Sequence, residues 1–432
     1  MSRATTRAAD VAASRATDVA TSRATDVAVS RATDVATSRA TDAAESRVSI
    51  VDWAAETAGD LDFSAARAWL AGDPSRRAAG YLPVYAPREV IRAAGLLPVG
   101  VHGGGDRLEI IRGDAFYQSY ICHLPRSVIE LAQSGRLSML SAMLFPSTCD
   151  VIRNLSGVWR LLYPDLYVRY LDLPQVPEPA IAADFWEGEL RTLFADLCAL
   201  AGIPESDARL RREIAVENEL RGVIAELYRL RRDAPEKVPT EELYTLLRAG
   251  EVVPAPAFLE KARAYLAAAE AEPSRLRDRV RVIVVGAFCE APPLGLIKTI
   301  ERSGCSIVDD DFLLGNRLVA EDVRLDGDPI RNLAEAFVRS ARKTSILYEG
   351  RPEGKRELIA RRVAAARADG VIFASASFCD PALLDRPMLR AGADAAGVPS
   401  IAFKFAENTG QFQQFRELAG TFADSIKLWG EK

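Results

Sequence analysis

Short apolar runs and amphipathic segments alternate along most of the chain. Leu96 to Val101 and Ala142 to Phe145 have the continuous apolar character of buried strands, while Arg88 to Ala94 and Pro125 to Gln133 have helical spacing. The first of these helices is predicted to stop at Gly95, because glycine readily adopts the left-handed conformation that closes a helix. Strands that alternate with helices in this way predict parallel β-sheet covered by helices.

The same alternation returns late in the chain, after a long stretch of helical periodicity. Residues 184–272 carry Glu, Arg and Leu at helical spacing and predict a helical insert. Beyond it, four strands are predicted, Arg281 to Val285, Ser306 to Val308, Val371 to Ala374 and Ser400 to Phe405, with helices at Leu294 to Arg302, Arg331 to Arg342, Lys355 to Ala368 and Gln411 to Ile426.

These patterns predict an α/β fold with two doubly wound, Rossmann-like parallel-sheet domains. The expected organisation is a repeat tail at 1–47, a first α/β domain with N-terminal helices at 48–183, a helical insert or connector at 184–275 and a second α/β domain at 276–432. Open α/β sheets bind ligands outside the carboxyl ends of their strands, so candidate functional residues are sought there.

The tail repeats an eight-residue unit, seen as Ser14 to Thr21 and starting again at Ser22, Ser30 and Ser38. Eight residues turn a helix by about 800°, so the valines of successive units spiral around the axis and form no apolar stripe. The units are also far shorter than those of solenoid proteins. We predict a disordered or transiently helical tail, with a docking segment as the alternative.

Charge and hydropathy narrow the class of protein. The 432 residues carry a formal net charge of −5, with a pI of about 5.5. This balance offers nucleic acid no basic footprint. No stretch approaches the roughly 18 to 20 apolar residues of a membrane helix, and the start of the chain lacks a signal-peptide pattern. We expect a soluble cytoplasmic protein that binds neither nucleic acid nor membranes.

The cysteines and histidines are sparse. The two histidines, His102 and His123, are too far apart to share a helix turn, which argues against a His-rich metal site. No C-x-x-C pair occurs, so neither a zinc ribbon nor a thioredoxin-type site is indicated. Scattered cysteines in a large chain indicate reduced thiols; they are Cys122, Cys149, Cys198, Cys289, Cys305 and Cys379.

Four of these cysteines have informative positions. Cys149, Cys289 and Cys379 follow predicted strands directly, and Cys122 precedes a helix near the same kind of edge. Two interpretations are open: Cys122, Cys149 and Cys379 are ordinary buried cysteines, or their thiolates converge from both domains on one iron–sulfur cluster. The remaining two, Cys198 and Cys305, lie in a helical apolar pattern and at a strand start and are predicted core thiols.

Several motifs, taken in order, resemble the 2-hydroxyacyl-CoA dehydratase D-component family, which includes the B and C subunits of ATP-dependent benzoyl-CoA reductase. The resemblance covers Gly80 to the C-terminus. It rests on Gly80 to Val99 (GYLPVYAPREVIRAAGLLPV), Pro146-Ser147-Thr148-Cys149-Asp150, Gly304 to Asp311, and Ser377-Phe378-Cys379-Asp380-Pro381. Two further stretches, Gly286 to Pro293 and Phe403 to Gln411, are more similar to the reductase branch.

The resemblance implies a cluster-bearing oxidoreductase subunit. In that family, two similar subunits each hold a [4Fe-4S] cluster through three cysteines, which match Cys122, Cys149 and Cys379 here; Cys289 has no clear counterpart. Electrons come from ferredoxin through a separate ATP-hydrolysing activator, consistent with the absence of a Gly-x4-Gly-Lys-Ser/Thr loop in this sequence. The implied reaction is reduction of the aromatic ring of benzoyl-CoA to a cyclohexadiene-carbonyl-CoA.

The physical chemistry suits such a donor. An added electron destroys aromatic stabilisation, so the donor needs a very low potential, and iron–sulfur clusters reach about −700 mV. Ring reduction also consumes protons. His123 is a candidate proton donor; the alternative is a hydrogen bond from its ring to a cluster sulfur or a backbone carbonyl.

Two polar motifs have simpler interpretations. Gly103 to Gly105 is expected to form a tight turn, with a position near the CoA phosphates as the alternative. Asp309 to Asp311 is expected to be a helix cap and solvated turn rather than a metal site. Two competing functions also stay open: a subunit of a 2-hydroxyacyl-CoA dehydratase, and a non-catalytic scaffold in the same complex.

Overall fold

The chain forms an α/β structure with two parallel sheets. The computed structural model describes residues 46–82, 84–175, 178–275, 278–286, 290–311, 321–341 and 352–429. The predicted tail therefore lies outside the described residues, apart from its last two positions. Val51 to Lys432 form one compact unit, separate from residues 1–50. Among the described residues, none of the helices combines the length and apolar character needed to span a bilayer.

The first sheet has four parallel strands in the order β2-β1-β3-β4. The strands are β1 (Arg77–Tyr81), β2 (Leu96–Gly100), β3 (Ala142–Pro146) and β4 (Tyr167–Leu171). The chain places β2 on one side of β1 and β3 on the other, so the connections diverge between β1 and β3. In doubly wound sheets, this divergence opens a crevice at the carboxyl ends of the strands.

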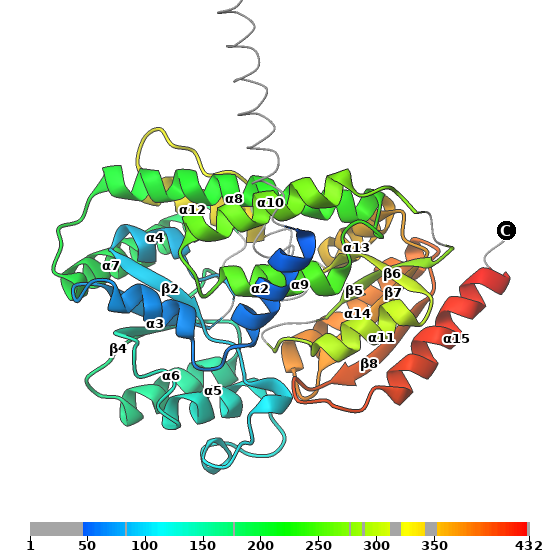
Figure 1. Ribbon diagram of the computed structural model, residues 1–432, viewed down its shortest axis with the longest axis horizontal. Coiled ribbons are helices and arrows are strands. Elements are labelled where there is room, and N and C mark those ends of the chain that lie inside the picture. The colour runs from blue at the N-terminus through cyan, green and yellow to red at the C-terminus, as the bar shows by residue number, and fades with distance from the viewer. Residues whose placement is uncertain are drawn as a thin grey trace, which may run out of the picture. The chain divides into compact units, whose positions relative to one another are not determined.

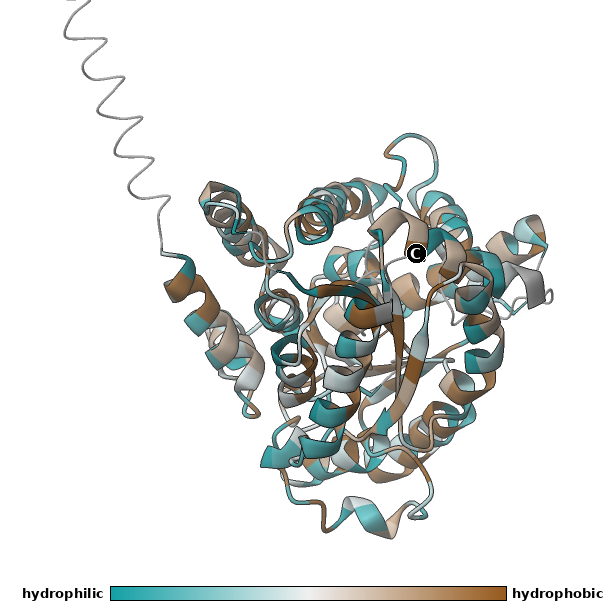
Figure 2. Cartoon of the chain, turned by 90° about the vertical axis from the view of Figure 1, so that its right-hand side faces the viewer, coloured by the Kyte–Doolittle hydropathy of each residue, from teal (hydrophilic) through white to brown (hydrophobic). Residues whose placement is uncertain are grey.

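The second sheet repeats this topology, with four parallel strands in the order β6-β5-β7-β8. Its strands are β5 (Val280–Val285), β6 (Cys305–Asp310), β7 (Gly370–Ala376) and β8 (Ser400–Phe405). The connections diverge between β5 and β7, so the second sheet has its own crevice. Figure 2 shows apolar colouring concentrated on the strands, with mixed colouring on the surrounding helices.

The helices of the first half surround the first sheet. The buried core on one face of this sheet includes Val90 and Ile91 of α4, Trp186 of α7 and Leu333 of α12. Helix α4 begins after Pro87 and ends before Gly95, whose φ of 82° agrees with the predicted stop. The helical elements are α2 (Arg47–Gly59), α3 (Ser64–Ala71), α4 (Arg88–Ala93), the 3-10 turns η1 (Gly105–Arg107) and η2 (Gly113–Ala115), α5 (Leu124–Gln133) and α6 (Asp150–Leu162).

The predicted helical stretch in the middle of the chain forms four helices. They are α7 (Pro179–Ala201), α8 (Asp207–Asp233), α9 (Thr240–Gly250) and α10 (Ala255–Ala271). The longest, α8, starts at Ser206, whose hydroxyl accepts a hydrogen bond from the Arg209 amide at 3.3 Å. In Figure 1, α8 and α10 run side by side.

All but one of the helices in the second half of the chain cover the two faces of the second sheet. Helices α11 and α15 pack on one face, and α13 and α14 pack together on the other (Figure 1). The exception is α12, which packs against α7 beside the first sheet. The helices are α11 (Leu294–Arg302), α12 (Pro329–Ala341), α13 (Pro352–Ala366), α14 (Asp380–Ala395) and α15 (Gln413–Trp429).

The prediction for the acidic triplet is wrong. Asp309 and Asp310 belong to strand β6, and all three aspartates are buried rather than solvated. Arg362 pairs with Asp309 at 2.7 Å, and Arg231 pairs with Asp310 at 2.5 Å. Asp311 accepts a hydrogen bond from the Gly286 amide at 2.9 Å. Buried Arg231 and half-buried Arg362 balance the charge of these carboxylates, and both arginines lie more than 50 residues away in the sequence.

Candidate functional site

Two of the predicted cluster cysteines occupy equivalent positions in the two sheets. Cys149 lies three residues after the end of β3 and directly precedes α6. Cys379 lies three residues after the end of β7 and directly precedes α14. Both strands flank the divergence of connections in their own sheet. Each cysteine therefore lies at the crevice where such sheets bind ligands.

Tyr117 brings Cys122 and Cys149 into one neighbourhood. Cys122 is buried and lies two residues before α5. Burial raises the pKa of the Tyr117 hydroxyl, and the negative thiolates of Cys122 and Cys149 raise it further. Both sulfurs are thus within electrostatic range of one phenol, which donates to the carbonyl of Val151 in the first turn of α6 at 3.4 Å.

The start of α6 offsets part of the effect of burial on Cys149. Burial raises the pKa of this thiol above its ordinary value, and the amides of Val151 and Ile152 and the Thr148 hydroxyl counter only part of the increase. Amides at a helix N-terminus stabilise negative charge, and a thiolate is the form that binds iron. Cys149 is therefore suited to metal coordination by its position.

A buried network of His123, Glu290 and Glu407 joins the two halves of the molecule. The His123 ring contacts Glu407, with 2.7 Å between Nδ1 and Oε1. The Glu290 carboxylate accepts from the amides of His123 and Glu407, each at 2.7 Å, and from that of Leu124 at 3.4 Å. Glu290 thus connects the start of α5 with the segment after β8, and these segments are more than 280 residues apart.

The two carboxylates influence one another. Burial raises the pKa of Glu290 to about 7, and the negative charge of Glu407 contributes to the increase. The amides of Glu407 and His123 oppose the shift by stabilising the ionised form. Glu290 is therefore a carboxylate that changes protonation near neutral pH beside the ring of His123.

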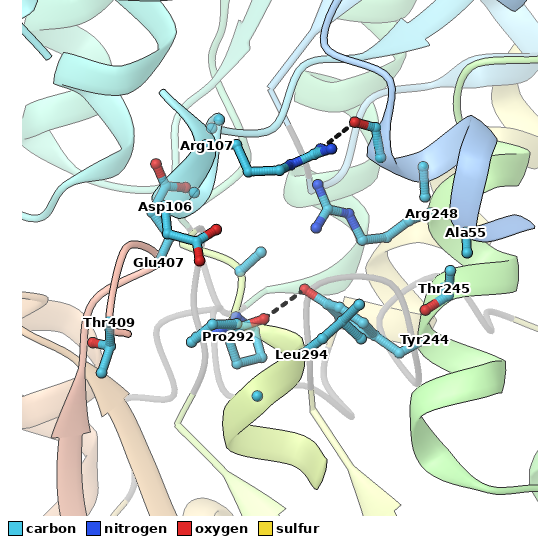
Figure 3. A pocket seen from close by; sticks show the side chains of 18 of the residues that line it. Ala55, Asp106, Arg107, Tyr244, Thr245, Arg248, Pro292, Leu294, Glu407 and Thr409 are labelled. Carbon is cyan, nitrogen blue, oxygen red and sulfur yellow. Dashed lines mark hydrogen bonds between the residues drawn. The ribbon is translucent and has the colours of Figure 1, made fainter. Parts of the chain in front are cut away.

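A cavity of about 440 Å³ borders this network (Figure 3). Glu407 lines the cavity on one side, and the Gly103–Gly105 turn forms part of the wall. Arg107 and Arg248 extend into it, from η1 and α9. The wall also includes the start of α11 at Leu294.

The other cysteines have different environments. Cys198 and Cys305 are buried, as predicted for core thiols, and burial raises the pKa of Cys305 to about 12. Cys289 lies outside the described residues. The described cysteines form no disulfides among themselves.

Within the described ranges, no three His, Cys, Asp or Glu side chains are arranged to hold one metal ion. A cluster keeps its ligand sulfurs farther apart than a single ion does, because irons and sulfides lie between them. The arrangement that holds one ion is therefore not the arrangement that a cluster needs. Cys122 and Cys149 lie near Tyr117, and Cys379 follows β7 of the second sheet.

Sequence reasoning missed the partners of His123. Both interpretations of this histidine invoke a cluster sulfur, a backbone carbonyl or the substrate, whereas its ring contacts a carboxylate. Glu290 and Glu407 each lie within a stretch that resembles the reductase branch. Their place in these two stretches marked both glutamates as candidate functional residues. Nothing in the spacing along the chain indicated that the two stretches meet in the fold.

The comparisons with known proteins define the family. The family described as "2-hydroxyglutaryl-CoA dehydratase, D-component" matches residues 83–426. The chain belongs to this family, which confirms the resemblance found in the motifs.

Within the family, the chain is similar to subunits of reductases and dehydratases. It is 51% identical to the C subunit of benzoyl-CoA reductase from Thauera aromatica over 370 residues, covering 86% of this chain and 96% of the relative. It is 26% identical to the beta subunit of lactoyl-CoA dehydratase from Anaerotignum propionicum, covering 82% and 93%. Identity to the beta subunit of (R)-2-hydroxyglutaryl-CoA dehydratase from Acidaminococcus fermentans is 27%, covering 81% and 93%.

Proposed function

We propose that this chain is the C-type subunit of an ATP-dependent benzoyl-CoA reductase. The observation that carries the proposal is the 51% identity to the C subunit of the Thauera aromatica enzyme over nearly the whole of both chains. Identity to the dehydratase subunits is about half as high over similar lengths. The reaction is reduction of the aromatic ring of benzoyl-CoA to a cyclohexadiene-carbonyl-CoA in the cytoplasm.

Cys122, Cys149 and Cys379 are the proposed ligands of a [4Fe-4S] cluster. Their support is the crevice position of Cys149 and Cys379 and the shared neighbourhood of Cys122 and Cys149 around Tyr117. When bound, such a cluster supplies electrons of low potential. The amides at the helix N-terminus behind Cys149 reduce the cost that burial imposes on its thiolate, and burial of Cys122 and Cys379 keeps water away.

His123 has a proposed role in handling protons. Its Nδ1–H donates to Glu407 when that carboxylate is ionised, which fixes the ring tautomer and leaves Nε2 to accept or return a proton. Glu290 holds the backbone of both residues in place. The network therefore presents an oriented imidazole next to the proposed ligand Cys122.

The proposal requires partners. The sequence has no P-loop, so ATP hydrolysis belongs to activator proteins that receive electrons from ferredoxin. A second, paralogous subunit with its own cluster pairs with this chain to form the catalytic unit. The relatives named above are themselves parts of larger enzymes, as their names as C or beta subunits state.

An anaerobic turnover assay tests the function. The chain is purified with its partner subunits and supplied with activator, reduced ferredoxin, ATP and benzoyl-CoA. We expect formation of a cyclic diene thioester that depends on ATP. Inertness toward benzoyl-CoA combined with dehydration of a 2-hydroxyacyl-CoA would replace the proposal with the dehydratase function.

The scaffold alternative needs a separate measurement. Serine replacement of Cys122, Cys149 and Cys379 together should remove iron from this chain and abolish ring reduction. If iron is lost while ring reduction continues at the original rate, the chain is a scaffold and the proposed electron transfer is refuted.

A further inference from the structure

A buried acid–base pair that the proposed mechanism does not use lies next to the cavity wall. His102 and Glu251 are 2.7 Å apart, measured between Nε2 and Oε2, and their side chains are only 7% and 1% exposed. His102 directly precedes the Gly103–Gly105 turn that forms part of the wall. Glu251 directly follows α9, and its backbone carbonyl accepts from the Gly100 amide at the end of β2 at 2.9 Å. The pair therefore joins the edge of the first sheet to α9.

Three polar atoms of this region are buried and have no hydrogen-bond partner among the described residues. They are Nδ1 of His102, Oε1 of Glu251 and the hydroxyl oxygen of Tyr81. Tyr81 is paired in register with Gly100, so it lies at the same edge of the sheet as His102. Burial, and after it the negative charge of Glu251, raises the pKa of the Tyr81 hydroxyl, so the carboxylate and the phenol are within electrostatic range. Buried polar atoms are normally paired, and three unpaired ones in one place indicate bridging water or a function.

The histidine end of this row lies at the cavity of about 440 Å³. Glu407 and Arg248 line that cavity, and both act on the charge of the His102 ring. Burial lowers the pKa of His102, and the positive charge of Arg248 lowers it further, whereas Glu251 and Glu407 oppose the shift. The ring is therefore uncharged near neutral pH, and it can accept a proton at one nitrogen and release one from the other.

The tyrosine end of the row lies near a second cavity. Arg88 opposes the increase in the pKa of Tyr81, so its guanidinium is within electrostatic range of the phenol. The same arginine lines a cavity of about 110 Å³ together with Glu217. Tyr85 and Ala86 in the wall of this second cavity are half-buried, so the cavity borders the surface of the chain. Its volume and its charged walls suit a few water molecules.

We infer that Tyr81, Glu251 and His102 form a proton relay that leads from the second cavity to the wall of the first. The inference rests on the proposed function, because reduction of the aromatic ring consumes protons and a closed site needs a route that supplies them. Phenol, carboxyl and imidazole groups can each donate and accept a proton, so a row of them passes protons with little movement. Neither Glu290 nor the proposed cluster ligands belong to this row.

Each cycle of the relay moves one proton and no electrons. In the loaded form, one proton lies between Oε2 of Glu251 and Nε2 of His102, and a second is on Nδ1. His102 releases the Nδ1 proton toward the cavity, and the shared proton moves fully onto Nε2. Tyr81 then restores the proton of Glu251 through Oε1 and takes one from water in the second cavity. A change of ring tautomer restores the loaded form, so one proton has entered and one has left.

Chemical rescue in the complete enzyme complex tests the relay. His102→Ala and Tyr81→Phe should each lower kcat for ring reduction by about tenfold or more and leave KM for benzoyl-CoA unchanged. Added imidazole should restore the rate of His102→Ala, because it fills the vacated space and carries protons. Pyrazole has nearly the same shape but is a far weaker base, so it should not restore the rate.

A matched control separates the relay from general effects of removing a buried hydroxyl. Tyr265→Phe removes the hydroxyl of a fully buried tyrosine on α10 that donates to Glu242 at 2.9 Å, and it should leave kcat unchanged. Equal rescue by imidazole and pyrazole would mean that His102 only fills space, and a wild-type rate in His102→Ala would mean that no proton passes through it. Either result overturns the inference.

Exchange of the His102 ring proton with water tests the relay without turnover. The chain has two histidines, so nitrogen-15 labelling of histidine gives two sets of ring signals in the full-length protein, and His102→Ala assigns them. We expect the ring N–H of His102 to exchange about tenfold or more faster in the wild type than in Tyr81→Phe, although the ring is buried. Equal exchange rates would overturn the relay. If the exchange rates differ as expected but the complex does not reduce benzoyl-CoA, the relay stands and the proposed function falls.

Discussion

The carboxylate of Glu407 reaches His123 only because position 103 carries no side chain. A Cβ built on Gly103 would lie 2.0 Å from both Glu407 carboxylate oxygens, which no packing tolerates. We predict that Gly103→Ala displaces Glu407 from His123. Loss of a hydrogen bond that involves a charged group should lower the free energy of unfolding by about 1.5 to 3 kcal/mol, measured by urea denaturation.

The control for this substitution is Gly157→Ala. Gly157 is exposed in α6, and a Cβ there would meet no atom within 4 Å. Alanine in a helix interior is favoured over glycine by up to about 1 kcal/mol, so the control should be neutral or stabilising. Equal stability of Gly103→Ala and the wild type would show that Glu407 does not depend on this glycine.

Glu290 gives the stability of the protein a specific pH dependence. Burial and the neighbouring Glu407 raise the pKa of Glu290 to about 7, from 4.5 for an ordinary glutamate. The native state therefore binds a proton more readily than the unfolded chain does. The stabilisation is full below about pH 4.5 and is lost as the pH rises toward 7, by roughly 3 kcal/mol in total.

Glu290→Gln should remove this contribution. We expect the wild type to lose stability relative to the variant between pH 5 and pH 8, as measured by urea denaturation at both values. Glu219→Gln, an exposed glutamate on α8, is the matched control and should follow the wild type at both pH values. Parallel pH profiles for wild type and Glu290→Gln would contradict the assigned shift.

The sequence located candidate residues better than their partners. Cys149 and Cys379 could be placed at strand ends, because short apolar runs followed by polar residues mark those ends. Glu290 and Glu407 could not be paired with His123, because their proximity depends on how the two sheets meet. Burial of Asp310 was equally hidden, since its partner Arg231 lies on a helix about 80 residues earlier.

At the level of elements, Cys149 and Cys379 each occupy the N-cap position of a helix. Serine is a favourable N-cap residue, so Cys149→Ser and Cys379→Ser should preserve α6 and α14. We predict that each variant folds with the circular dichroism of the wild type and loses most of the iron of this chain. Anaerobic iron and sulfide quantitation measures the outcome.

Core cysteines supply the comparison. Cys198→Ser and Cys305→Ser place a hydroxyl in apolar surroundings and should cost stability while leaving the iron content unchanged. Full iron content in Cys149→Ser and Cys379→Ser would remove both residues from the proposed ligand set.

Element prediction failed where apolar content was low. Strand β1 has the sequence RAAGY, whose alanines and glycine lack strand preference, and β4 has the sequence YVRYL, of which only Leu171 is fully buried. The pattern predicts neither strand. By contrast, the apolar runs of β2, β3, β5 and β7 were predicted to within a few residues, because strands buried on both faces have that signature. Strand β8 was also predicted, although its Lys404 is exposed.

At the scale of the whole molecule, α8 connects the two sheets through buried charges. Near the first sheet, Glu217 of α8 contacts Arg88 and Arg92 of α4, the latter at 2.7 Å. Burial alone would raise the pKa of Glu217, but the two arginines outweigh it and lower the pKa. Near the second sheet, Arg231 at the other end of α8 contacts Asp310 of β6. Helix α8 therefore makes buried ion pairs with both halves. If either half unfolds, a buried charge of α8 loses its partner, which costs free energy.

This arrangement predicts a single cooperative unfolding transition for Val51 to Lys432. Glu217→Gln removes the carboxylate that pairs with buried Arg88 beside the first sheet, and Asp310→Asn removes the one that pairs with buried Arg231 beside the second, each at a cost of about 3 to 5 kcal/mol. Because α8 ties the halves together, either substitution should reduce the protection of amides in β1 and β3 and in β5 and β7 equally. Native-state hydrogen exchange measures both sheets in one experiment, with Glu219→Gln as the exposed control on the same helix. Loss of protection in the first sheet alone for Glu217→Gln, or in the second alone for Asp310→Asn, would mean that the sheets unfold independently and that α8 does not couple them.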